Sequence, residues 1–139
     1  MRYPAKIARA GSGFMVTFRD IPEAMTGACT FEEARLMAPD ALLTALGYYF
    51  EGQIAVPNPS SRRPGEECFP LPPVLSAKVL LLNELVSQAV SPGELRRRMR
   101  VPQQEVTRLM DPFHPTQINT IALALAAVGR SLQLSVARA

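Results

Sequence analysis

Two short stretches near the start of the chain alternate apolar with other residues, and this alternation predicts two β-strands. The apolar positions are Tyr3, Ala5 and Ile7 in the first stretch, then Phe14, Val16 and Phe18 in the second. Between them, Gly11–Gly13 can supply the positive φ angles of a hairpin turn. Pro4 cannot donate to a strand ladder, which favours an edge position for the first strand. A short third strand is expected near Met25–Cys29.

The apolar spacing then changes to a helical period, and a long helix is predicted to begin at Thr30. Thr30 and Glu33 form a T-x-x-E capping box, in which each side chain can satisfy a backbone N–H at the helix start. One apolar stripe follows at Ala34, Ala38, Ala41, Leu42, Ala45, Leu46 and Tyr49. Pro39 lies inside this helix and removes one of its hydrogen bonds, so it is a candidate kink.

The middle of the chain has the composition of a connector. Residues 54–73 contain six of the thirteen prolines, together with serine, arginine and glycine. Within this stretch, the segment "ECFPLP" (67–72) suggests a short edge strand that belongs to the preceding sheet.

The second half of the chain shows helical periods only, until its last residues. We expect a helix over 76–90 and a short helix that follows Ser91. A third helix is expected to begin near Pro102 and end at Asp111, and a longer one to cover 116–129. Ser76 and Thr116 are the expected N-caps of the first and last of these, and Pro92 suits the first position of the second. Alternation at 132, 134 and 136 suggests a terminal strand.

The two short helices in this half have the apolar spacing of a helix-turn-helix unit. Leu95 and Met99 would form the inner face of the first helix, and Val106 and Leu109 that of the second. Val101 would fill the turn between them. In such units two helices cross over a small core, and the second lies in the major groove of DNA.

The polar positions of this pair suit DNA. The outward residues of the second helix are Gln103, Gln104, Thr107 and Arg108. Glutamine can pair with adenine through two hydrogen bonds, and arginine with guanine. The arginines of the first helix, Arg97 among them, and Arg100 in the turn would contact phosphates and fix the register. Any amphipathic helix pair with a solvated arginine face would show the same spacing, so the residues alone leave both readings open. Arg100 also stands where glycine usually provides a left-handed turn residue, so a reshaped turn is one outcome.

Charge is distributed unevenly along the 139 residues. Residues 1–73 hold seven Lys/Arg against eight Asp/Glu, a net charge of −1, whereas residues 74–139 hold eight against four, a net charge of +4. This asymmetry favours two parts with different partners, the second being a polyanion. Cys29 and Cys68 lack a metal-type spacing, and no run of about 18 apolar residues occurs. A cytoplasmic protein without a disulfide, a metal or a membrane span is expected.

Several segments occur in a set order that covers about the full length: "RYPAKI", "FMVTFRDIPEA", "TGACTFEEA", "DALLTALGYYFE" and "SAKVLLLNELV", followed by "ELRRRMRVPQQEVTRLMD". In this order the chain resembles the HicB antitoxin family of bacterial toxin–antitoxin operons, in its helix-turn-helix form. The resemblance implies an α+β protein. Residues 1–56 would be a partial ribonuclease H-like β-β-β-α-β domain, 57–73 a Pro-rich linker, and 74–139 a small all-α helix-turn-helix domain.

The resemblance also implies a function. The first domain would bind and neutralise a HicA-type mRNA-cleaving toxin, and the second would repress the operon by binding its operator as a dimer or a higher even oligomer. No enzymatic activity, cofactor or metal is expected, because the first strand has no carboxylate for a metal-dependent nuclease. A regulator whose N-terminal domain senses a small molecule is the alternative, and a residual RNA-cleaving enzyme is a more distant one.

The toxin contacts cannot be assigned from the sequence. Acidic residues that could face a basic toxin are Asp20, Glu23, Glu32, Glu33, Asp40 and Glu51. The same acids could equally cap helices and solvate a surface.

Overall fold

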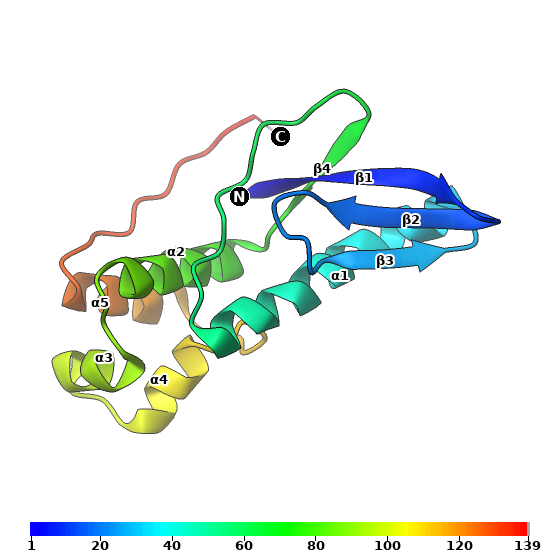
Figure 1. Ribbon diagram of the computed structural model, residues 1–139. Coiled ribbons are helices and arrows are strands. Elements are labelled where there is room, and N and C mark those ends of the chain that lie inside the picture. The colour runs from blue at the N-terminus through cyan, green and yellow to red at the C-terminus, as the bar shows by residue number, and fades with distance from the viewer. Residues whose placement is uncertain (139) are drawn as a thin grey trace.

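The computed structural model describes residues 1–138, which form a four-stranded sheet with one long helix and then a helical region (Figure 1). The strands are β1 (Arg2–Ala10), β2 (Gly13–Phe18), β3 (Met25–Ala28) and β4 (Glu66–Pro70). The helices are α1 (Phe31–Gly52), α2 (Pro73–Ser87), α3 (Pro92–Met99), α4 (Gln103–Leu109) and α5 (Ile118–Ala127). The predicted α+β class and the β-β-β-α-β order of the first half are confirmed.

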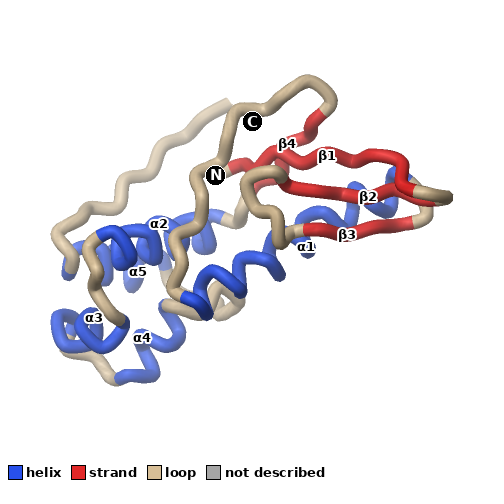
Figure 2. Tube along the Cα trace, in the orientation of Figure 1, coloured by secondary structure: helices blue, strands red, loops and turns tan. Residues whose placement is uncertain are grey.

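The sheet has the strand order β3-β2-β1-β4 (Figure 2). Neighbouring strands are antiparallel. β1 and β2 form the expected hairpin, in register from Ala5 opposite Phe18 to Ala10 opposite Gly13. In the turn, Gly11 has a φ of 60°, a conformation that glycine adopts without steric cost. β3 and β4 are the two edges of the sheet, and α1 packs against one of its faces.

The expected edge position of β1 is wrong, because β1 is an inner strand. It pairs with β4 from Arg2 to Lys6, but with β2 only from Ala5 onward. At Pro4, therefore, β1 has a strand neighbour on one side only. The missing N–H of Pro4 interrupts no pairing with β2, which explains how a proline fits here.

α1 begins as predicted, since the Thr30 hydroxyl accepts a hydrogen bond from the N–H of Glu33 at 3.1 Å. Its buried residues are Ala34, Ala38, Leu42, Ala45, Leu46, Tyr49 and Phe50. The helix continues through Pro39 without interruption. The Tyr49 hydroxyl donates to the Glu23 carboxylate at 2.7 Å, which ties α1 to the turn before β3. Burial of the Tyr49 hydroxyl raises its pKa, and the hydrogen bond to Glu23 adds a smaller effect in the same direction.

The Pro-rich segment after α1 has no regular secondary structure, but both halves of the protein hold it in place. The side-chain amide of Asn83, on α2, accepts from the N–H of Val56 at 2.8 Å and donates to its carbonyl at 3.0 Å. The Tyr3 hydroxyl donates to the Pro57 carbonyl at 2.7 Å. The segment is therefore anchored from α2 and from the sheet at once.

β4 confirms the short edge strand that was expected within this segment. Its first residue, Glu66, accepts hydrogen bonds from Nε of Arg19 at 2.9 Å and from the N–H of Arg63 at 2.7 Å. Nearby, the Asp20 carboxylate accepts from both the N–H and the hydroxyl of Ser60, at 2.8 and 2.6 Å. These contacts fix the connector against the sheet on its way into β4.

α2 contributes to two hydrophobic cores. The residues packed with the sheet and α1 are Leu75, Val79 and Leu82, and those packed with the C-terminal helices are Ala77, Leu81 and Leu85. One helix therefore completes the interior of both halves, and Figure 1 shows it lying between them.

Two helix starts differ from the predicted ones. α2 begins at Pro73 rather than at Ser76, because a proline at the first helical position has its φ already set for a helix. α5 begins at Ile118, and its N-cap makes no side-chain hydrogen bond. The Thr116 hydroxyl instead donates to the His114 carbonyl, at 3.4 Å.

Residues 130–138 do not form the predicted terminal strand. The segment begins at Arg130, whose Nε lies 3.1 Å from the Glu84 carboxylate on α2, and then runs without regular secondary structure. Leu134 and Val136 are 78% and 102% exposed. A strand requires a neighbour to satisfy its backbone groups, and none of the four strands pairs with this segment.

Among residues 1–138, no single helix combines the length and apolar character needed to cross a membrane. α2 and α3 together would meet such a test by length and composition alone, but they are bent by 106° relative to one another. Six apolar residues of α2 are buried in the two cores.

Candidate nucleic-acid interface

α3 and α4 form the pair of short helices that the apolar spacing predicts. Leu95 of α3 and both Val106 and Leu109 of α4 are fully buried. Met99 and Val101 are half-buried and pack against the same core. The two helices therefore cross over a small apolar centre, as in a helix-turn-helix unit.

Arg100 is the left-handed residue of the turn between α3 and α4. It has φ 57° and ψ 48°, and its N–H donates to the Arg96 carbonyl at 2.9 Å. The turn thus keeps the geometry that glycine usually supplies, at a cost of about 1–2 kcal/mol for a residue with a Cβ. At the other end of α3, the Ser91 hydroxyl accepts from the N–H of Glu94 at 3.1 Å, so both ends of this eight-residue helix are capped.

The four candidate base-reading residues of α4 are all exposed, but they lie in two environments. Gln103 and Thr107 line a groove of about 850 Å³ between α4 and the C-terminal half of α1. Gln104 and Arg108 are outside this lining. Both lie two residues from Val106, which places them on the opposite side of the helix from the buried face. Gln104 and Arg108 are therefore the best placed to meet a ligand that approaches from solvent.

The arginines of α3 differ in their charge partners. Nη2 of Arg97 lies 2.6 Å and Nε of Arg98 lies 3.2 Å from the Glu94 carboxylate. The hydrogen bond from Arg97, and to a smaller extent that from Arg98, holds the pKa of Glu94 below its usual value. Within the described part of the chain, Arg96 and Arg100 make no ion pair. They offer free cations for phosphate, whereas Arg97 shares its charge with Glu94.

Lys78 of α2 is fully buried and fixes the C-terminal end of α4. Its ammonium donates to the carbonyl oxygens of Arg108, Asp111 and His114, at 3.0, 2.7 and 2.8 Å. Burial lowers the pKa of Lys78, and the charge of Asp111 partly offsets this. Three donors thus meet three acceptors. The sequence signal was a single lysine within the apolar stretch "AKVLLL" (77–82), to which the sequence analysis gave no role.

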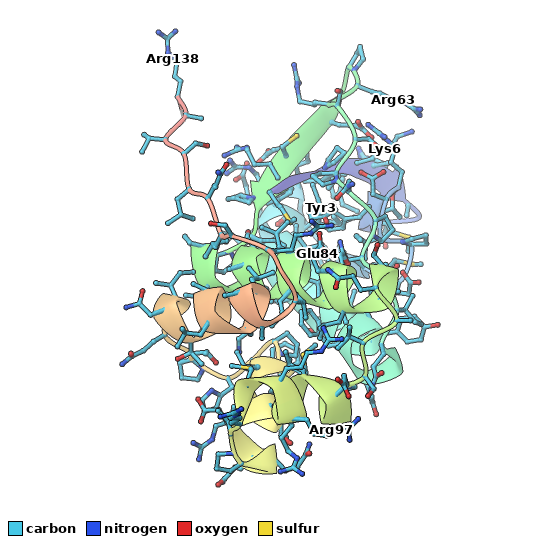
Figure 3. The ribbon with its side chains drawn as sticks, turned by 90° about the vertical axis from the view of Figure 1, so that its left-hand side faces the viewer. Tyr3, Lys6, Arg63, Glu84, Arg97 and Arg138 are labelled. Atoms are coloured by element: carbon cyan, nitrogen blue, oxygen red, sulfur yellow. The ribbon has the colours of Figure 1, made fainter. Side chains whose placement is uncertain are left out.

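The loop after α4 also contacts α1. The ring of Phe113 lies so close to Gly47 that a Cβ on that residue would be 3.2 Å from Cε2 of the ring. The loop can approach this closely because Gly47 has no side chain, and the contact holds the end of α4 near α1. Figure 3 shows Arg97 at one end of the molecule and Lys6 and Arg63 at the other.

Two of the acidic residues that could face a toxin make hydrogen bonds within the chain. Asp20 is hydrogen-bonded to Ser60, and Glu23 to Tyr49. In the part of the chain that the structure describes, no group of three or more His, Cys, Asp or Glu side chains could hold a metal ion.

The sheet and α1 thus lie at one end of the molecule, and the crossed helices α3 and α4 lie at the other. Comparison with known sequences gives its family. The chain belongs to the HicB-like antitoxins, since the family described as "HicB_like antitoxin of bacterial toxin-antitoxin system" matches residues 2–80.

Curated relatives agree with this assignment over nearly the whole chain. A protein of Photorhabdus laumondii named "Antitoxin HicB 2" is 46% identical over 134 residues, which are 96% of this chain and 95% of the relative. "Antitoxin HicB" of Escherichia coli is 42% identical over 96% of this chain and 98% of the relative. "Antitoxin HicB" of Pseudomonas fluorescens is 33% identical, with 96% and 92% covered. All three relatives are named antitoxins, which agrees with the expectation that the chain is not an enzyme.

Proposed function

We propose that this chain neutralises a HicA-type mRNA-cleaving toxin through its sheet and α1, and represses its own operon through α3 and α4. Membership of the HicB-like family and the names of the relatives support the antitoxin role. The same membership favours it over a small-molecule sensor. The functional division proposed for the chain is residues 1–56 for the toxin, 57–73 as connector, and 74–139 for DNA and dimerisation.

One observation carries the repressor role: α4 exposes a polar face to solvent, whereas its apolar face is buried in the core. Gln104 and Arg108 face away from the buried Val106, and their side chains suit adenine and guanine respectively. Gln103 and Thr107 would read bases at the margin nearest α1. Phosphate contacts would come from Arg97 and Arg100, and from Arg96, which makes no ion pair within the described part of the chain.

The test is DNA binding by the full chain, measured by fluorescence anisotropy with DNA from upstream of its gene. Gln104→Ala should weaken binding to the operator by about 1–3 kcal/mol while leaving binding to random DNA unchanged. Gln117→Ala is the matched control, an exposed glutamine that lies outside α4. Equal losses on operator and random DNA, or no loss at all, would contradict the base-reading role.

A dimer is proposed because one helix-turn-helix reads only a half-site, and paired units are spaced by about 34 Å along DNA. The C-terminal segment offers the apolar side chains of Leu134 and Val136, which a second copy could cover. In sedimentation experiments, Leu134→Asp combined with Val136→Asp should shift the chain toward monomer. Leu36→Asp, at a position 77% exposed on α1, is the control. A double variant that sediments as the wild type would exclude this segment from the interface.

A further inference from the structure

A groove runs between the free edge strand β3 and the helix α1, at the end of the molecule that holds the sheet. Its volume is about 500 Å³. Three large apolar side chains line it and remain exposed: Met25 on β3 at 56%, and Met37 and Tyr48 on α1 at 44% and 55%. Exposed apolar side chains gathered in one hollow are typical of a protein interaction site.

Acidic side chains border the apolar part of this groove. Glu23 and Asp40 are among its lining residues. At the helical period, Glu33, Met37, Asp40, Thr44, Tyr48 and Glu51 fall on one stripe of α1, which contains three acids and no base.

The positive charge of α1 lies on the opposite flank. Arg35 is the single basic residue of this helix, and its Nε is 2.8 Å from the carboxylate of Glu67 on β4. Glu32 adds to the field at Arg35 and is not part of the groove. The flank toward β3 is therefore acidic and the flank toward β4 is internally neutralised.

β3 adds a second kind of contact. It pairs with β2 on one side only, so its other side presents backbone N–H and C=O groups beside the groove. A partner segment in an extended conformation could hydrogen-bond to this edge while its side chains enter the hollow.

We propose that the groove between β3 and α1 is the surface that binds the toxin. This inference rests on the proposed function and names the contact site within it. A protein that cleaves RNA needs a cationic surface to hold its substrate, and a complementary inhibitor presents acids around an apolar centre. Met37 and Tyr48 provide that centre, and Asp40 with its neighbouring acids provides the charge. A nucleic acid does not fit here, because these carboxylates would repel phosphate.

Calorimetric titration of the full chain with its cognate HicA-type toxin tests the proposal. Asp40→Lys and Met37→Lys should each weaken toxin binding at least 10-fold. Glu32→Lys introduces the same charge change on the other flank of α1 and should stay within about twofold of wild type. All three positions are exposed, so thermal melting should show the variants folded. In hydrogen-exchange experiments, the amides of Met25–Ala28 should gain protection when the toxin is bound.

The outcomes separate the site from the function. If the wild type binds the toxin and both groove variants bind equally well, the toxin contacts another surface and the proposal is overturned. If the wild type does not bind the toxin, the proposed function itself fails. If Asp40→Lys instead dissociates the free chain into a smaller species, the groove joins copies of this chain, and the toxin assignment is wrong.

Discussion

The ammonium of Lys78 lies 2.7 Å from the carbonyl oxygen of Asp111, the second residue after the end of α4. This buried contact joins the helix that both cores share to the helix proposed to read DNA. Because the acceptors are backbone carbonyls, the outward side chains of α4 take no part in the anchoring.

Replacing Lys78 with methionine should destabilise the fold strongly. Lys78→Met leaves three carbonyl groups without their donor, and a hydrogen bond to a charged group contributes about 1.5–3 kcal/mol. Part of this loss is offset, because the variant no longer buries a charge. We expect a loss of roughly 3 kcal/mol in the free energy of unfolding, measured by urea denaturation. Lys6→Met, at an exposed lysine of β1, should change it by less than about 0.5 kcal/mol. A loss of the same small size at Lys78 would show that water can replace its ammonium.

Two substitutions of Asn83 should lower the free energy of unfolding by different amounts, because Asn83 both accepts a hydrogen bond from the Val56 backbone and donates one to it. Asn83→Leu removes both partners of the Val56 backbone and should cost about 1–3 kcal/mol in the free energy of unfolding. Asn83→Asp keeps the acceptor for the Val56 N–H and should cost less. Limited proteolysis should then cut the connector faster in the leucine variant. Equal cleavage rates in the two variants and the wild type would mean that other contacts hold the connector.

The left-handed conformation of Arg100 separates stability from DNA binding. Arg100→Gly should raise the free energy of unfolding by up to about 1 kcal/mol, because the strain of a Cβ in this conformation is removed. Arg100→Ala removes the charge but keeps the strain. Both should weaken DNA binding and lower its salt dependence, since each removes a proposed phosphate contact. Unchanged salt dependence in both would remove Arg100 from the interface.

Glu66 predicts a dependence of stability on pH. The hydrogen bond from Arg19, and then that from the Arg63 N–H, hold the pKa of Glu66 below its usual value. The folded state therefore binds this proton less readily than the unfolded state, so the stabilisation is complete above about pH 4.5 and is lost as the pH falls through the folded-state value. The melting temperature of Glu66→Gln should lie below that of the wild type at pH 7, and the two should converge as the pH falls below the folded-state pKa of Glu66. A difference that does not change with pH would contradict this cause.

Local patterns predicted most elements of the fold. In the first half of the chain, alternation, the glycine turn and the cap at Thr30 depend on neighbours in sequence, and the structure agrees at each of them. The apolar spacing of Leu95, Val106 and Leu109 likewise predicted the crossing of α3 and α4. Alternation near the C-terminal end predicted a strand that does not form, because a strand also needs a partner to pair with. Left-handed geometry at Arg100 was an open question, because the strain of a single residue is balanced by packing that sequence does not show.

The remaining features depend on contacts between distant segments. Pro4 fits an inner strand only because the pairing of β2 starts one residue later. Lys78 acquires its role from a loop more than thirty residues away. The surroundings of Gln103 and Thr107 also depend on a distant segment. These two residues line a groove whose other side is formed by α1, whereas Gln104 does not line it. Spacing along one helix cannot report such neighbours.

The double role of α2 has a mechanical consequence. One face of α2 is packed in the core of the sheet and α1, and another face is packed in the core of the C-terminal helices. These two parts of the protein therefore cannot rotate relative to each other without opening a packed core. In the function proposed here, α2 would fix the distance and the angle between the bound toxin and the bound operator. Inserting a single residue into α2 would turn one end by about 100° relative to the other.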